Sequence, residues 1–260
     1  MVYLVIIKKI FKSQLQYVSA TILRLIISLL TFFIQVSLWS ALIASGQRTD
    51  TTVEEMIVYV ILTMFVSTFT SGNIAVNLEP TIRDGSIANQ LIKPISFKYY
   101  CFSEVIGKNV YNVVTSTIPI MILGFIIYTP VLPKLIYSIL FIISIMLGCM
   151  IMLELTYIFG LLAFFTQRAW YINWYLNAFF TLFGGSVVPL WFYPNVLNRI
   201  SYFLPFRYIS FEPINFFLQR TELSQSLFFL VVPILWILVL ILIGNFVFRL
   251  VNEKLTINGG

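Results

Sequence analysis

The sequence predicts an all-α integral membrane protein with about six membrane-spanning helices. Hydrophobic residues make up 60% of the 260 residues and charged residues only 10%, a composition that excludes a globule covered by water. The apolar residues form continuous runs of roughly twenty, the length that a helix needs to cross a hydrocarbon core of about 30 Å. Continuous runs favour helices over a β-barrel, whose strands would appear as alternating segments. We expect one transmembrane domain over residues 1–260.

The expected spans and the basic residues between them predict the orientation. The spans are residues 22–44, 53–76, 105–129, 135–163, 170–190 and 226–248. Lysine and arginine accumulate on the cytoplasmic side of short loops. With both termini inside, eleven of the 16 basic residues face the cytoplasm, and the five outside are Arg48, Lys134, Arg199, Arg207 and Arg220. This bias predicts cytoplasmic termini and explains most of the net charge of +6, so no nucleic acid is needed as a partner.

Residues 1–21 predict an amphipathic helix that lies in the membrane interface. Its apolar residues fall on one side and its basic residues on the other, namely Ile6, Ile7, Ile10 and Phe11 against Lys8, Lys9 and Lys12. The order of segments in a removable signal peptide is missing. The alternative is that these residues are the frayed start of the first span.

Residues 77–104 predict a cytoplasmic loop with a short amphipathic helix. The helix is expected to begin at Glu79 and Pro80, to turn at Gly85, and to stop at Lys93-Pro94, because the residue before proline is pushed out of the helical region. An apolar stripe runs along it, formed by Ile82, Ile87, Leu91 and Ile92. We interpret it as a docking helix for a soluble partner; the alternative is a solvated connector.

The segment after the fifth expected span predicts a re-entrant outer region over residues 191–225. It is too apolar for a solvated loop, yet helix-breaking residues interrupt it: Gly184, Gly185, Pro189, Pro194 and Pro205. Half-helices that dip into the outer leaflet satisfy both facts if their backbone ends are buried in protein. The alternative is an aromatic belt at the interface.

The residue inventory excludes most catalytic chemistry in this chain. The absence of histidine excludes imidazole-based acid–base catalysis and imidazole metal sites. Cys101 and Cys149 are too far apart to form a zinc motif, and no GxxxxGK[ST] phosphate loop is present. We therefore expect no metal and no cofactor in this chain, and no enzymatic activity. Any energy for work must come from a partner.

Polar residues within the apolar runs are candidates for a pathway through the membrane. Glu154 is the acid within the fourth span, and we expect it near the inner interface, paired with a base such as Arg168. Gating, pairing between subunits and proton coupling stay open as alternatives. The neutral candidates for a pathway or an interface between subunits are Gln35, Asn73 and Asn177. Such amides also serve as hydrogen-bonding links between helices.

The order of three segments resembles the permeases of bacterial type 2 ABC exporters. They are IRDGSIANQLIKP after the second span, LLAFFTQRAW between the fourth and fifth, and GGSVVPLWFYPNVLNRISYFLPF after the fifth. The first follows the family pattern I-R-x-G-x-I-x-x-x-L-x-K/R-P, which here falls on Ile82, Arg83, Gly85, Ile87, Leu91, Lys93 and Pro94. The resemblance covers nearly the whole chain.

This resemblance implies a transport subunit in the bacterial inner membrane that dimerises with an identical or homologous permease. Two copies of a cytoplasmic ABC ATPase would bind it and hold the ATP and magnesium. The coupling residues would be Glu79, Arg83, Asp84, Gly85, Ile87 and Leu91, and residues 189–206 would close the pathway on the outside. The expected cargo is an amphipathic or hydrophobic drug, peptide or lipid. The alternatives are the membrane-embedded substrate-capture subunit of an importer and an integral-membrane lipid-modifying enzyme.

Overall fold

The computed structural model describes residues 2–45, 51–128, 132–166 and 170–258. Within these ranges the regular secondary structure is entirely helical. Five stretches of the described chain are long and apolar enough to cross a membrane: Val18–Ala44, Val53–Arg83, Phe97–Tyr128, Leu135–Thr166 and Leu223–Glu253. The predicted all-helical membrane fold is therefore confirmed, and the protein is a multi-pass membrane protein.

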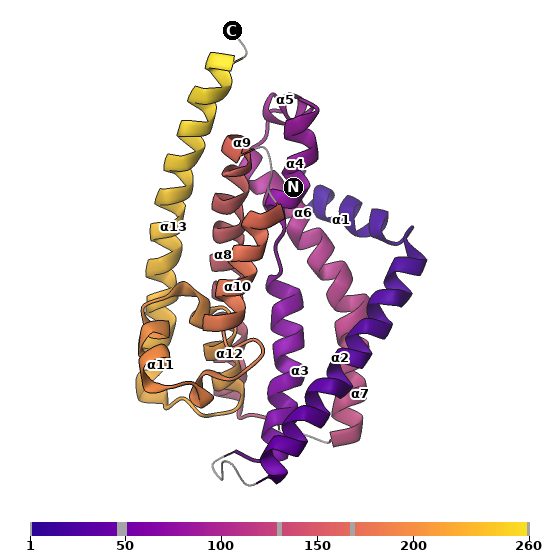
Figure 1. Cartoon of the computed structure of the whole chain (residues 1–260), viewed down its shortest axis with the longest axis vertical. Helices are drawn as coiled ribbons and strands as arrows, with labels where there is room; N and C mark the ends of the chain where they lie inside the picture. Colours follow the sequence, from indigo (N-terminus) through magenta and orange to yellow (C-terminus); the bar gives the residue numbers. More distant parts are fainter. Residues whose placement is uncertain (1, 46–50, 129–131, 167–169, 259–260) are drawn as a thin grey trace.

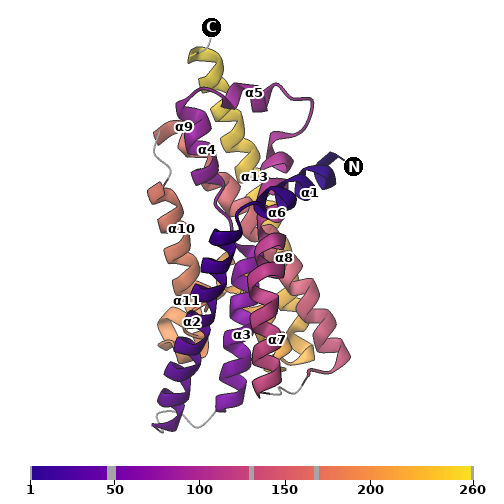
Figure 2. The ribbon, with the colours of Figure 1, turned by 90° about the vertical axis from the view of Figure 1, so that its right-hand side faces the viewer.

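The spanning helices form an elongated bundle with two different ends (Figure 1). The long elements are α2 (Val18–Ala44), α3 (Val53–Thr70), α6 (Phe97–Asn112), α7 (Ile118–Tyr128), α8 (Leu135–Leu161) and α13 (Leu223–Asn258). One end, the terminal end, carries α4 (Ile74–Arg83), α5 (Ile87–Leu91) and the last turns of α13. The opposite end carries α11 (Asn195–Tyr202) and α12 (Phe211–Phe217), and Figure 2 shows the same division from the side.

Helix α1 (Val2–Gln14) lies across the bundle near the terminal end and packs on α6 (Figure 1). The packing is close, because a Cβ added at Gly107 would lie 2.9 Å from the Cβ of Ile10. Lys8, Lys9 and Lys12 point away and are exposed. The predicted N-terminal helix is present but shorter than residues 1–21, and the first span begins at Val18 instead of residue 22. Its position at a membrane interface stays a prediction.

The second span is broken within its length, which the sequence did not predict. Helix α3 ends at Thr70 and α4 begins at Ile74, so carbonyl groups at the end of α3 need partners from elsewhere. Asn109 of α6 supplies them, because its Nδ2 donates to the Phe69 carbonyl at 3.0 Å and to the Ser71 carbonyl at 2.6 Å. Gly72 makes the close approach to α8 possible, since a Cβ there would lie 2.4 Å from Thr156.

The fifth expected span, residues 170–190, is shorter than predicted. Helix α10 (Trp170–Phe183) has 14 residues, about 21 Å at 1.5 Å per residue, which is less than the hydrocarbon thickness of about 30 Å. The Gly184 amide donates to the Phe180 carbonyl at 2.8 Å, and Gly185 adopts a φ of +67° that favours glycine. The glycine pair therefore ends α10, and a sixth full span is not confirmed.

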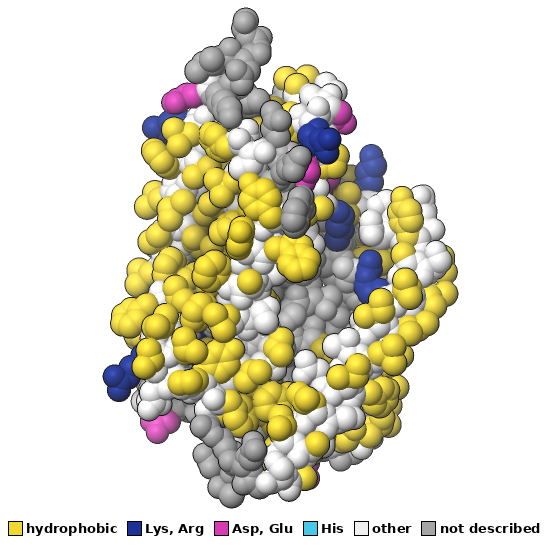
Figure 3. Space-filling model, in the orientation of Figure 1, with side chains coloured by type: hydrophobic (Ala, Val, Ile, Leu, Met, Phe, Trp, Pro, Cys, Tyr) yellow, Lys and Arg dark blue, Asp and Glu magenta, His cyan; other side chains and the backbone are white. Residues whose placement is uncertain are grey.

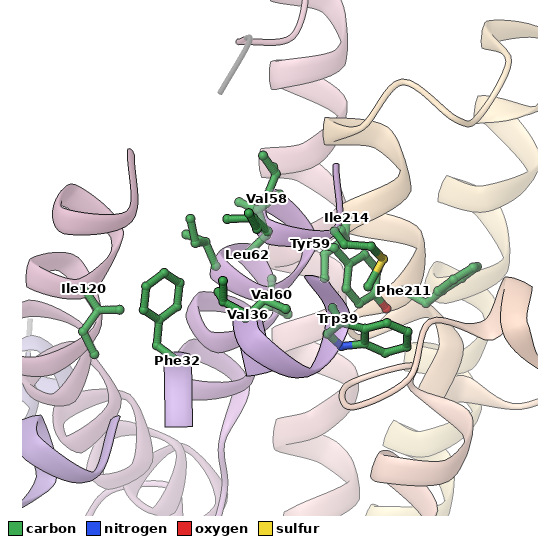
Figure 4. Packing of buried hydrophobic residues seen from close by; sticks show 14 of the residues in the cluster. Phe32, Val36, Trp39, Val58, Tyr59, Val60, Leu62, Ile120, Phe211 and Ile214 are labelled. Carbon is green, nitrogen blue, oxygen red and sulfur yellow. The ribbon is translucent and has the colours of Figure 1, made fainter. Parts of the chain in front are cut away.

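Clusters of buried apolar side chains hold the bundle together. The largest joins α2, α3, α7 and α12 and includes Phe32, Tyr59, Ile120 and Ile214 (Figure 4). Outside the core, apolar side chains cover much of the surface (Figure 3). On α13, for example, Leu242 is 70% exposed. A surface of this kind is suited to contact with lipid chains rather than water.

Candidate functional site

A cavity of about 320 Å³ lies between α2, α3, α10 and the segment that follows α10. Its lining is rich in hydroxyl and amide groups, contributed by Thr31, Gln35, Tyr59, Ser67, Asn177, Thr181 and Ser186. Gln35 Oε1 is buried and has no hydrogen-bond partner among the described residues. Two of the predicted pathway residues, Gln35 and Asn177, therefore line the same space. Their role in transport stays a prediction.

A second cavity, of about 680 Å³, continues from the first along α10. The two share Asn177 and Thr181, while Trp174, Leu182 and Tyr193 give the second cavity a more apolar wall. Together they form a groove, which we call the α10 groove. The face of the molecule in Figure 3 is hollowed between α2 and the helices opposite it. A groove with one polar and one apolar part matches an amphipathic ligand.

The glycine pair after α10 closes the groove toward the core. Tyr59 Oη donates to the Gly185 carbonyl at 2.5 Å, which ties the turn to α3. A Cβ at Gly185 would lie 3.0 Å from Phe211 of α12, and one at Gly184 would lie 2.5 Å from the Phe180 carbonyl. Both positions therefore require glycine.

The prolines of the predicted outer region begin helices instead of merely breaking them. Pro189 and Pro194 each precede a helix as its N-cap residue, and Pro205 is the first residue of η3 (Pro205–Tyr208). The region forms short helices at the α11–α12 end of the molecule. Whether they re-enter a membrane stays a prediction.

A buried ion pair organises this region, and the sequence analysis missed it. Arg207 was predicted to face the outside, but it is 4% exposed and its Nε donates to Glu212 Oε1 at 2.5 Å. Its Nη1 donates to Asn198 Oδ1 at 2.7 Å and to Ser201 Oγ at 2.9 Å. Burial raises the pKa of the Glu212 carboxyl, against the opposing effect of Arg207. The spacing of Arg207 and Glu212 within an aromatic stretch is the signal that could have revealed the pair.

A second ion pair at this end ties α3 to the turn after α12. Arg220 Nη2 donates to Glu55 Oε2 at 2.9 Å and to Thr51 Oγ1 at 3.0 Å, while its guanidinium lies 4.1 Å from the centre of the Trp191 ring. Glu55 is half-buried in this bidentate pair.

At the terminal end, the predicted docking segment is divided into α4 and α5. The expected start at Glu79 is wrong, because the helix begins at Ile74, directly after the break in the second span. Pro80 lies inside α4, whose first turns are held by packing of Ile74 and Leu78. The apolar stripe also divides. Ile87 and Leu91 pack into the core of this end, whereas Ile92 is 80% exposed.

The turn between α4 and α5 presents charged groups to the surroundings. Arg83 and Asp84 are exposed, and with Val76, Glu79 and Pro80 they line a cavity of about 520 Å³. Asp84 Oδ1 accepts a hydrogen bond from the Ser86 amide at 2.9 Å, and hydrogen bonds from Ser86 lower the pKa of Asp84. Gly85 has a φ of +74° and open space around it.

Glu154 has a different partner from the one expected. Its Oε1 lies 2.7 Å from Lys98 Nζ at the start of α6, whereas Arg168 lies outside the described residues. The carboxylate is 2% exposed, and Oε2 has no hydrogen-bond partner in the described part of the chain. Asn73 is exposed at the break between α3 and α4 and lines neither cavity of the α10 groove.

Two further residue types complete the comparison with the sequence. Cys101 and Cys149 are both buried, and each is a free thiol. Within the described residues no group of three or more histidine, cysteine, aspartate or glutamate side chains is placed to hold a metal ion.

Comparison with protein family models identifies the family of this chain. No curated protein matches it. A family model described as "ABC-2 family transporter protein" matches residues 39–259, which include α10, the segment from α4 to α5 and the short helices of the α11–α12 end. Because this range covers most of the sequence, the chain belongs to the ABC-2 family of transporter proteins, as a membrane-embedded permease subunit.

Proposed function

We propose that this permease subunit exports an amphipathic or hydrophobic drug, peptide or lipid from a bacterial cell, driven by a separate ATPase. The observation that carries the proposal is the α4–α5 segment. It projects at the same end as the chain termini and presents Arg83, Asp84 and Ile92 outward. An exposed large apolar residue beside charged groups is typical of a surface that binds another protein. The chain therefore acts in transport, and ATP hydrolysis belongs to the partner.

The α4–α5 segment is attached to the bundle in a way that suits the transmission of movement. The break at residues 71–73 separates α4 from α3, while α4 packs on α8 through the close contact of Ile74 with Gly160. Lys108 Nζ also donates to Asn77 Oδ1 at 2.9 Å. A push on α4 would therefore reach α6 and α8 before it reaches α3. Helix breaks of this kind absorb changes of direction during conformational steps.

The α10 groove is the proposed pathway, completed by a second permease that is identical or homologous. Trp174 on α10 is 72% exposed and Ile34 on α2 is 66% exposed, so the helices beside the groove carry large exposed apolar groups. The hydroxyl and amide groups inside would bind the polar part of a cargo, and the apolar wall the rest. Two permeases would then bind two copies of the ATPase.

The test is reversal of the two exposed charges, Arg83→Glu with Asp84→Lys, in the full-length chain. The expected result is normal insertion with loss of the ATPase that co-purifies with the unchanged chain in mild detergent. Reversal of Lys8 and Lys9 to glutamate serves as the control, since these residues are exposed at the same end but on α1. Undiminished co-purification after the first reversal would contradict docking at this segment. Retention of a small molecule by the chain alone, without any ATPase, would favour a capture subunit.

A further inference from the structure

A cavity of about 610 Å³ lies between α6, α8 and α13 near the terminal end, and the transport proposal does not use it. It shares no lining residue with the α10 groove. We propose that this cavity binds the headgroup of a zwitterionic phospholipid that carries a primary ammonium group. The proposal concerns a lipid of the surrounding bilayer, so it stands independently of the direction and cargo of transport.

The cavity is built from stripes of side chains on α8 and α13. On α13 the lining residues are Ile241, Asn245, Phe248 and Asn252, which repeat with the spacing of one helix face. On α8 they are Met150, Glu154 and Tyr157, with the same kind of spacing. An amide on the exposed face of an apolar spanning helix costs free energy unless it meets a polar group. Asn245 is such an exposed amide, and it faces this cavity.

The charges in the cavity match those of a zwitterion. Lys98 Nζ contacts Glu154 Oε1 at 2.7 Å and has three donors, of which the carboxylate oxygen takes one. Glu154 Oε2 is buried against α13, because a Cβ added at Gly244 would lie 3.6 Å from it, and it has no donor among the described residues. A turn of the Glu154 side chain toward the cavity would let a lipid ammonium donate to Oε2 while the phosphate accepts from Lys98. The headgroup then lies antiparallel to the ion pair, and each charge gains an opposite neighbour.

Aromatic rings around the cavity also favour the binding of an ammonium group. The rings of Phe102 and Tyr157 each lie 5.6 Å from Lys98 Nζ, and Phe97 and Phe248 stack at 6.0 Å beside them. Ring faces attract ammonium groups. The cavity therefore offers a carboxylate oxygen and aromatic faces, an environment that favours an ammonium over a hydroxyl headgroup.

The cavity lies at the position along the spanning helices where a lipid headgroup is expected. Glu154 is about 28 Å along α8 from Leu135 at 1.5 Å per residue, close to the far side of a hydrocarbon core of about 30 Å. Met150 at the rim is 43% exposed, so the cavity is open to the side. Farther from the terminal end, Met146 on α8 and Leu238 on α13 are each 54% exposed. These side chains continue toward the membrane centre, where acyl chains would lie.

The experiment is a lipid titration of the purified full-length chain in mild detergent, read by native mass spectrometry. The probes are phosphatidylethanolamine, phosphatidylcholine and phosphatidylglycerol. We expect phosphatidylethanolamine to bind at least about tenfold more tightly than phosphatidylglycerol, since a hydrogen bond to a charged group contributes that much. Equal binding of the two would overturn the proposal, as would tighter binding of phosphatidylcholine, which has no ammonium hydrogen to donate.

Three variants test whether the lipid binds in this cavity. Glu154→Gln should lower the affinity for phosphatidylethanolamine by about tenfold and leave that for phosphatidylglycerol unchanged. Asn245→Leu changes an exposed residue at the rim, so the fold is retained while the headgroup loses space and a polar contact. Glu55→Gln, which alters the ion pair at the opposite end, is the matched control and should bind like the unchanged chain. Unaltered lipid binding by both Glu154→Gln and Asn245→Leu would show that the lipid binds elsewhere.

Discussion

The two ends of the molecule each contain a buried ion pair, but the pairs differ in how fully they are hydrogen-bonded. At the α11–α12 end, the Arg207 guanidinium donates to Glu212, Asn198 and Ser201 and lies 3.7 Å from the centre of the Tyr202 ring. At the terminal end, Glu154 has one ionic contact, to Lys98, and its second oxygen has no partner in the described part of the chain.

The difference indicates two roles for buried charge. A charge that donates hydrogen bonds to several segments holds them in one arrangement, and its loss leaves several groups without partners. A charge with unused bonding capacity is costly in the fold but available to a ligand or to a moving neighbour. We interpret the α11–α12 end as a fixed scaffold and the terminal end as the adaptable one. The predictions below test this contrast, from the largest expected effect to the smallest.

Loss of the scaffold arginine should have the largest effect. Arg207→Met leaves Glu212 buried without its cation, which costs about 3–5 kcal/mol for a buried pair. We expect little folded protein, measured as the monodisperse fraction in size-exclusion chromatography and as the thermal unfolding midpoint. Arg199→Met is the control, because Arg199 lies exposed on the neighbouring helix α11. Wild-type stability of Arg207→Met would refute the scaffold interpretation.

Strain at the turn between α4 and α5 should have an intermediate effect. Gly85 has a φ of +74°, so Gly85→Val costs about 1–2 kcal/mol locally without any clash. Because the segment is at the surface, we expect normal insertion but loss of ATPase stimulation, measured as ATP hydrolysis by the reconstituted complex. Ala88→Val, at an exposed helical position of α5, should retain stimulation. Full stimulation in Gly85→Val would remove the turn from the coupling route.

Replacement of the Lys98–Glu154 pair by apolar residues should change the free energy of unfolding little. The double variant Lys98→Met with Glu154→Leu removes both charges, and such exchanges are often neutral or stabilising, so we expect a change below about 1 kcal/mol. The equivalent exchange Arg207→Met with Glu212→Leu should be more harmful, because Asn198 and Ser201 lose their shared donor. Thermal unfolding of the two double variants compares them directly. Equal destabilisation would erase the contrast between the ends.

The smallest effect concerns the protonation of Asp84. Hydrogen bonds from Ser86 lower the pKa of Asp84 in the folded chain. The ionised carboxylate therefore stabilises the folded turn above the unfolded-state pKa of about 3.9, and this stabilisation is lost as the pH falls through the lower folded-state pKa. We expect hydrogen-exchange protection of the Ser86 amide, corrected for the intrinsic rate, to decrease at strongly acidic pH. Asp84→Asn should show no such decrease.

The sequence predicted the parts of the fold that depend on composition along one segment. Long apolar runs were enough to locate five of the expected spans, and Lys93-Pro94 correctly marked the end of α5. The break at residues 71–73 could not be predicted in this way, because its carbonyl partners come from Asn109, far away in the chain. The early end of α10 depends likewise on Tyr59 of α3, which holds Gly185.

The candidate sites were predicted less completely, for an electrostatic reason. Counting charges by loop assumes that an arginine outside the spans is solvated, and Arg207 violates that assumption because Glu212, Asn198 and Ser201 replace water around it. For Glu154, the position along α8 predicts a depth near one membrane interface, which stays a prediction, whereas the partner depended on where α6 begins. Gln35 and Asn177 could be brought together only by the packing of α10 near α2 and α3.

Photo-crosslinking from Ile92 tests the central claim, that the adaptable terminal end binds an ATPase. Ile92 beside α5 and Phe203 at the α11–α12 end are matched probes, since each is an apolar residue that is 80% exposed. A photoreactive amino acid at position 92 should capture a protein with a Walker motif in intact cells, and the same group at position 203 should not. Capture of such an ATPase from position 203, or of none from position 92, would contradict the account.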